Sequence, residues 1–145
     1  SGALGFEALS RGAAFVRFIE KAPAVIAWIE RNRRGLGIES VEIVRGDVVS
    51  RLTGANDLGA FDVAFLDPPY RMGLIDPALA ALIAGGFHGI AVIERDKREL
   101  LPSAEGVPRW TRARSYGDTV LDFLTIGSEK EAGNDCEHGL GEDES

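Results

Sequence analysis

The residues Asp67, Pro68, Pro69 and Tyr70 directly follow an apolar segment, FDVAFL, at positions 61–66. Proline has no backbone N–H to donate to a strand ladder, so we expect the strand to stop at Pro68. The acid and the aromatic ring are then held stiffly at the carboxyl end of that strand. In α/β proteins this edge of the sheet is where ligands bind.

The exocyclic amine of a nucleobase is a poor nucleophile because its lone pair is delocalised into the ring. The Asp67 carboxylate and the Pro68 carbonyl could accept the two amine hydrogens and favour a pyramidal nitrogen as charge develops. Tyr70 could stack on a base that has left its helix, and Arg71 is placed to meet a phosphate. These residues therefore indicate methyl transfer to a base amine, with an ordinary proline turn as the alternative.

Two glycines and two acids could bind a nucleoside cofactor. Gly2 and Gly5 form G-x-x-G, which one more upstream glycine would extend to the G-x-G-x-x-G loop; helix capping is the alternative. Glu20 ends the next predicted strand and can accept hydrogen bonds from both ribose hydroxyls. Its alternative is a solvated acid paired with Lys21. Asp47 could accept from an adenine amine, or could simply follow Gly46 in a turn.

Short apolar segments rich in β-branched residues alternate with helical ones, which indicates βαβ units and a mostly parallel sheet. The helix at 23–37 has Val25, Trp28, Ile29 and Leu36 on its expected apolar face. The helix at 76–86 has Asp76 as its expected N-cap and Gly85 as its stop. The expected parallel strands are 15–20, 41–44, 61–66 and 89–94, and the expected antiparallel pair is 109–117 with 119–126. The predicted fold is α/β and doubly wound, with the antiparallel pair closing one edge.

The sequence opens on SGALG and enters a helix with no strand before it. A doubly wound sheet has its central strand at that point, and a sheet without it would leave neighbouring edges unpaired. We therefore expect that the sequence is N-terminally truncated and that this first strand is missing from it.

Composition limits the class of protein. The chain has 145 residues, of which 45% are hydrophobic, enough for the core of one domain at 1–127. It lacks a run of about 18 apolar residues, so no membrane partner is expected. The histidines have no neighbours at metal-ligand spacing, so no metal is expected. The single cysteine, Cys136, fits a reducing, cytoplasmic setting.

The net charge of −7 is unevenly distributed. Residues 128–145 contain seven acids and one base, which gives −6 and leaves −1 for residues 1–127. This segment lacks aromatic and β-branched residues, and we expect a disordered acidic tail. Because the remainder is nearly neutral, the overall charge neither supports nor excludes a nucleic-acid partner.

Five segments occur in an order that resembles the RsmD-type family, over residues 1 to about 126: SGALGFEALSRGA, FIEK, GD, FLDPPYRMGL and YGDTVLDFL. This family comprises bacterial S-adenosylmethionine-dependent methyltransferases that modify the N2 amine of a guanine in 16S ribosomal RNA. DPPY alone is shared with other amino-group methyltransferases. The opening segment and the terminal YG-T segment indicate this family more narrowly.

The resemblance implies a Rossmann-like methyltransferase fold and S-adenosylmethionine as cofactor. It implies that Gly2 and Gly5 shape the loop around the methionine part of the cofactor. It also implies that Glu20 holds the ribose hydroxyls and that Asp47 and Val48 bracket the adenine.

The resemblance further implies that residues 67–70 hold a flipped guanine, and that the partner is ribosomal RNA or the assembling small subunit. Two features of the family are absent: its first strand and the upstream arginine-rich segment that helps bind RNA. Ala22 also stands where an acid commonly follows. Two alternatives stay open, an adenine-N6 methyltransferase on DNA or RNA and a catalytically incompetent fragment.

Overall fold

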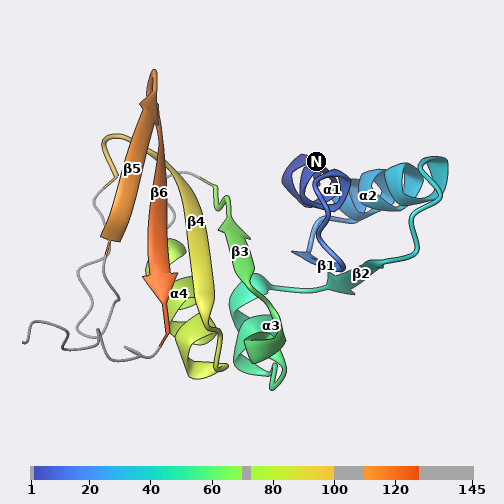
Figure 1. Cartoon of the computed structure of the whole chain (residues 1–145), viewed down its shortest axis with the longest axis horizontal. Coiled ribbons are helices and arrows are strands. Elements are labelled where there is room, and N and C mark those ends of the chain that lie inside the picture. The colour runs from blue at the N-terminus through green and yellow to red at the C-terminus, as the bar shows by residue number, and fades with distance from the viewer. Residues whose placement is uncertain (1, 70–72, 100–109, 128–145) are drawn as a thin grey trace, which may run out of the picture.

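The structure is a computed structural model, which describes residues 2–69, 73–99 and 110–127 (Figure 1). The expected tail at 128–145 lies outside the described residues, and its disorder stays a prediction. The helices are α1 (Ala3–Ser10), α2 (Pro23–Gly35), α3 (Val48–Thr53) and α4 (Ile75–Ala84), with a 3-10 helix at Leu58–Ala60. The strands are β1 (Val16–Glu20), β2 (Val41–Arg45), β3 (Val63–Leu66), β4 (Gly89–Asp96), β5 (Trp110–Tyr116) and β6 (Thr119–Ile126).

The strands confirm the α/β class and the antiparallel pair at one edge. β3 and β4 are parallel, β6 is antiparallel to β4, and β5 lies outermost in the order β3-β4-β6-β5. β1 and β2 form a separate parallel pair. The strand order is therefore that of a doubly wound sheet divided between β1 and β3.

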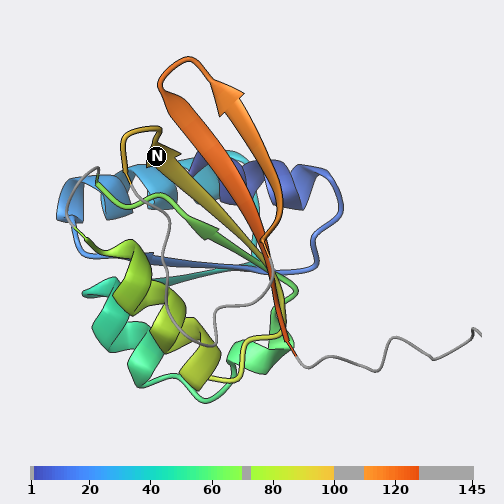
Figure 2. The same cartoon turned by 90° about the vertical axis from the view of Figure 1, so that its left-hand side faces the viewer.

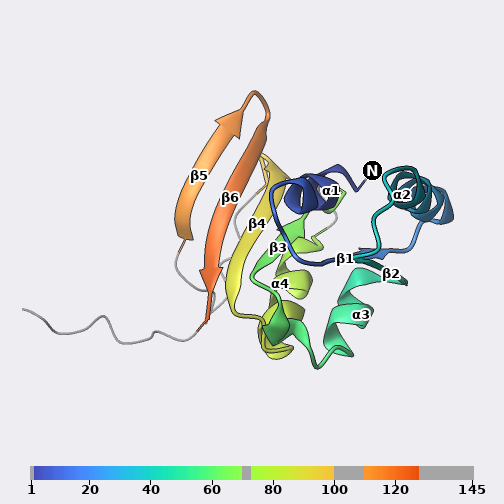
Figure 3. The same cartoon turned by 45° about the vertical axis from the view of Figure 1, so that its right-hand side comes forward.

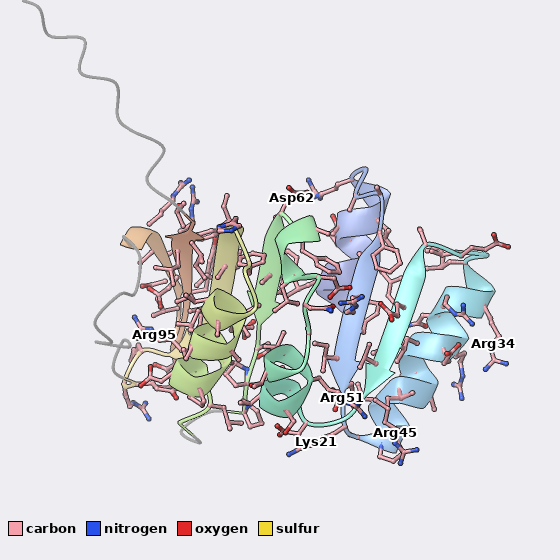
Figure 4. The ribbon with its side chains drawn as sticks, turned by 90° about the horizontal axis from the view of Figure 1, so that it is seen from below. Lys21, Arg34, Arg45, Arg51, Asp62 and Arg95 are labelled. Atoms are coloured by element: carbon pink, nitrogen blue, oxygen red, sulfur yellow. The ribbon has the colours of Figure 1, made fainter. Side chains whose placement is uncertain are left out.

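β1 and β3 run in the same direction, and the β1–β2 pair is set apart from β3 (Figure 1). Lys21, which follows β1, and Asp62, which precedes β3, are labelled at opposite ends of the strands in Figure 4. No ladder joins β1 to β3 in the described ranges. A sheet without its central strand would divide at this place, although the existence of an upstream strand stays a prediction.

Helices cover both faces, as the alternating pattern predicts. α1 and α2 lie on one side of the strands and α3 and α4 on the other (Figures 2 and 3). The main core lies between α4 and the inward-facing residues of β4 and β6, which alternate with outward-facing ones. Its largest members are Phe87, Leu79, Ile93 and Leu124, each at most 2% exposed.

The apolar face predicted for α2 is only partly correct. Ile29 is buried, but Trp28 is 57% exposed and Leu36 is 63% exposed. The apolar face of α2 therefore includes Ile29 but leaves Trp28 and Leu36 in solvent. Trp28 instead lies 5.5 Å from the Arg31 guanidinium. Pro23 begins the helix as predicted, and Gly35 is its last residue.

The predicted N-cap of α4 is wrong by two residues. The helix begins at Ile75 with Leu74 as its N-cap, and Asp76 lies within the first turn. Ile75 is only 4% exposed, so starting the helix earlier buries an additional apolar side chain. Asp76 still interacts favourably with the positive end of the helix dipole. Gly85 follows the last helical residue, as predicted.

Arg17 joins β1 to the segment that leads into β3. Its Nη1 and Nη2 atoms donate to the two carboxylate oxygens of Asp57 at 2.9 and 2.7 Å, and its Nε donates to Glu42 at 2.5 Å. The guanidinium also lies 4.9 Å from the Phe61 ring centroid. This bidentate arrangement fixes β1 relative to β3 although no ladder joins them in the described part of the chain.

We expect the Arg17–Asp57 pair to make stability depend on pH. The hydrogen bond from Arg17 lowers the pKa of Asp57, and the positive charge of Arg17 adds to the effect. A lowered acid pKa contributes stability that is present above the unfolded value of about 3.9 and is lost as pH falls through the folded value. Chemical denaturation between neutral and acidic pH should therefore show a smaller acid-induced loss in Asp57→Asn than in the wild type. Identical pH profiles would contradict this role.

Candidate functional site

The candidate site lies along the carboxyl ends of β1, β2 and β3. Glu20 pairs with Arg45 in the β1–β2 register, and the Gly46 amide donates to the Glu20 carbonyl at 3.0 Å. The ends of these two strands are therefore joined, which brings Glu20 close to Asp47. Because β3 runs in the same direction as β1, Asp67, the first residue after β3, lies at the carboxyl ends of the strands as well.

The Glu20 side chain is held by its own backbone. Its Oε1 atom accepts hydrogen bonds from the amides of Lys21 and Ala22, both at 2.8 Å. Among the described residues Glu20 forms no ion pair with the Lys21 ammonium, which disfavours the alternative of a simple surface pair. The second carboxylate oxygen can still accept from a ligand, in a fixed orientation.

Asp47 caps α3, a helix that was not predicted from the sequence. Its Oδ1 atom accepts from the Ser50 amide at 3.0 Å at the start of α3, and this hydrogen bond lowers the pKa of Asp47. Val48 is the first helical residue and packs partly against the core. Asp47 before an apolar pair, with Gly54 seven positions later, was the signal that could have predicted α3.

Gly2 and Gly5 are required by packing between α1 and its neighbours. Gly2 has a φ of 72°, a conformation that favours glycine. A Cβ on Gly5 would lie 2.5 Å from the Phe18 ring and 2.9 Å from Val16. The glycines therefore place the start of α1 against β1 and α2. Their predicted contact with a cofactor stays a prediction.

We expect Gly5→Ala to destabilise the chain by about 1–3 kcal/mol, the usual cost of overpacking. The added methyl group has no space because the Phe18 ring already occupies it. Thermal or chemical denaturation would measure the change. Gly35→Ala is the matched control, since a Cβ at Gly35 meets no atom within 4 Å. An equal effect of the two substitutions would contradict the close approach of α1 to β1.

The end of β3 confirms the predicted strand stop. β3 ends at Leu66, and Asp67 and Pro69 are exposed while Pro68 is half-buried. No hydrogen bond or ion pair involving the Asp67 side chain occurs within the described ranges. Tyr70 and Arg71 lie outside the described residues, so their predicted roles stay predictions.

Three cations on this edge were not singled out from the sequence. Lys21 follows β1, Arg45 ends β2 and Arg51 lies on α3; their side chains are labelled at the same end of the strands in Figure 4. Each is separated from the others in sequence, so no local motif marked them. Only the parallel pairing of β1 and β2, with α3 after it, brings them together.

Two further features bear on the class of site. In the ranges that the structure describes, no group of three or more His, Cys, Asp or Glu side chains could hold a metal ion. No described helix is long and apolar enough to cross a membrane.

The sequence matches the family described as Conserved hypothetical protein 95 over residues 1–125. It is 32% identical over 128 residues to Ribosomal RNA small subunit methyltransferase D of Haemophilus influenzae, which covers 85% of this chain and 65% of that protein. It is 35% identical to the protein of the same name from Buchnera aphidicola (Acyrthosiphon pisum), over 57% of this chain and 42% of that protein. The chain thus spans less than two thirds of these relatives.

Solved structures agree with the Rossmann-like methyltransferase fold. A candidate methyltransferase from Escherichia coli superposes with a TM-score of 0.75 and 26% identity, over 88% of this chain and 73% of that one. A conserved hypothetical protein from Streptococcus pyogenes superposes with a TM-score of 0.73 and 28% identity, over 87% and 80%.

Proposed function

The chain belongs to the Conserved hypothetical protein 95 family, and from this premise we propose that it transfers a methyl group from S-adenosylmethionine to the N2 amine of a guanine in small-subunit ribosomal RNA. The observation that carries the proposal is that β1, β2 and β3 run in the same direction, so that Glu20, Asp47 and Asp67 all stand at carboxyl ends of these strands. The names of the relatives support ribosomal RNA as substrate. The proposed setting is the cytoplasm, during assembly of the small subunit.

The residues at the ends of β1 and β2 suit a nucleoside. Ribose hydroxyls and the adenine amine are hydrogen-bond donors, and the acids Glu20 and Asp47 offer acceptors. The two backbone amides on Glu20 fix its carboxylate before any ligand binds, which reduces the ordering cost of binding. When bound, S-adenosylmethionine supplies an electrophilic methyl group. Gly2 and Gly5 would place the first turn of α1 beside it.

Asp67 would orient the base amine. Its carboxylate and the Pro68 carbonyl accept the two amine hydrogens, so the nitrogen lone pair is directed away from the ring plane. The Asp67 carboxylate would stabilise the positive charge that develops on the nitrogen. Tyr70 would stack on the extruded base and Arg71 would bind a phosphate near it.

Nucleoside mass spectrometry of small-subunit ribosomal RNA, after incubation with the chain and isotopically labelled S-adenosylmethionine, tests the proposal. We expect the label in N2-methylguanosine. Label in N6-methyladenosine would replace the proposed base with adenine, since both amines present two hydrogens to Asp67 and Pro68. Absence of label in any nucleoside, under conditions in which the chain binds S-adenosylhomocysteine, would contradict methyl transfer to this RNA.

A further inference from the structure

Resting on the proposed function, we infer that Lys21, Arg45 and Arg51 form a phosphate-binding surface for the RNA substrate, here called the basic edge. The three side chains are exposed and lie at the same end of the strands as Glu20 and Asp47 (Figure 4). Their positions are fixed by the fold. Arg45 pairs in register with Glu20, and the Arg51 side chain lies over the backbone of Gly46.

The charges of the basic edge are not neutralised by neighbouring acids. Within the described ranges, no acidic group lies within ion-pairing distance of Lys21, Arg45 or Arg51. Six other described cations do form such pairs: Arg11, Arg17, Arg33, Arg95, Lys97 and Arg98.

Two acids at the same strand ends as the basic edge already accept hydrogen bonds from backbone amides. Glu20 accepts from Lys21 and Ala22, and Asp47 accepts from Ser50. Lys21 is close enough to lower the pKa of Asp47 through its charge, after the larger contribution of the Ser50 amide. Three cations gathered without ion pairs are a place where a polyanion gains favourable contacts.

RNA is the polyanion that fits this position. Residues 1–127 carry a net charge of −1, so their net charge gives no general attraction to a polyanion, and phosphate contacts must come from local clusters of cations. A guanine held at Asp67 would leave its flanking phosphates at the carboxyl ends of the strands, where Lys21, Arg45 and Arg51 lie. Phosphate contacts of this kind position the substrate without reading its sequence.

The test compares Arg45→Gln/Arg51→Gln with Arg31→Gln/Arg34→Gln, a control of equal charge change on α2. Binding to a 16S ribosomal RNA transcript is measured at several salt concentrations, and S-adenosylhomocysteine binding is measured in parallel. We expect the basic-edge variant to bind RNA at least about tenfold more weakly. The slope of the logarithm of the RNA-binding constant against the logarithm of the salt concentration should become shallower by about 1.4–1.8, because two phosphate contacts are lost. The control should keep the wild-type slope, and both variants should bind S-adenosylhomocysteine normally.

Each other outcome overturns the inference and identifies what failed. A wild-type slope in Arg45→Gln/Arg51→Gln would show that these cations do not contact phosphate. Weaker binding of S-adenosylhomocysteine in that variant, with unchanged RNA binding, would assign the cations to the cofactor. A wild-type chain that binds neither ligand would remove the proposed function itself, whereas one that binds the cofactor product but not RNA would remove only the basic edge.

Discussion

Asp67→Ala is expected to reduce the rate of methyl transfer by about 100- to 1,000-fold, the usual effect of removing one preorganised group that stabilises developing charge. The side chain is exposed and outside the core, so the fold should be retained. Glu20 and Asp47, which would hold the cofactor, are on other strand ends. Single-turnover methylation of small-subunit ribosomal RNA measures the rate, and calorimetry checks that S-adenosylhomocysteine still binds.

Asp62→Ala is the matched control for this substitution. Asp62 is also an exposed carboxylate beside β3, but it lies at the opposite end of the strand (Figure 4). We expect the Asp62→Ala variant to transfer methyl groups at the wild-type rate. Substantial turnover by Asp67→Ala, or an equal loss in the two variants, would contradict the role assigned to Asp67.

Asp122→Ala is expected to lower the free energy of unfolding by about 3–5 kcal/mol, because it leaves a buried charge without its partner. Asp122 on β6 is 1% exposed and Arg95 on β4 is 9% exposed. The Arg95 Nε donates to Asp122 at 2.5 Å, and its Nη1 donates to the Glu99 carbonyl at 2.8 Å. The loss should appear in denaturant titrations as a lower midpoint, and it is a large part of the total stability of a small domain.

Two further variants define the origin of that loss. Arg95→Met/Asp122→Leu removes both charges and should recover much of the stability, since apolar replacements of buried ion pairs are often neutral. Asp118→Ala breaks the exposed contacts with Lys97 and Arg98 and should change stability little. A double variant as unstable as Asp122→Ala would show that shape, and not charge, is what this position requires.

Much of the fold could be predicted because its signals are local. Segments rich in β-branched residues predicted β1, β2, β3 and β4, and Pro68 predicted the end of β3. The first positions of α2 and the end of α4 followed from Pro23 and Gly85. The start of α4 could not be predicted in this way, because the burial of Ile75 against the core outweighed the capping preference of Asp76.

The candidate site could be predicted only in part. Each acid was recognisable at the end of its own strand, and the parallel topology brings Glu20 and Asp47 together. The ion pairs between distant residues could not be predicted from local sequence patterns, since Arg95 and Asp122 are 27 positions apart and Arg17 and Asp57 are 40 positions apart.

Calorimetric titration of this chain with S-adenosylhomocysteine tests most directly whether the edge is a cofactor site. We expect saturable one-to-one binding that Glu20→Ala abolishes. Glu39 is an exposed acid in the loop before β2, and Glu39→Ala should leave the binding unchanged. Absence of saturable binding, or binding that survives Glu20→Ala, would contradict the assignment of this edge to the cofactor.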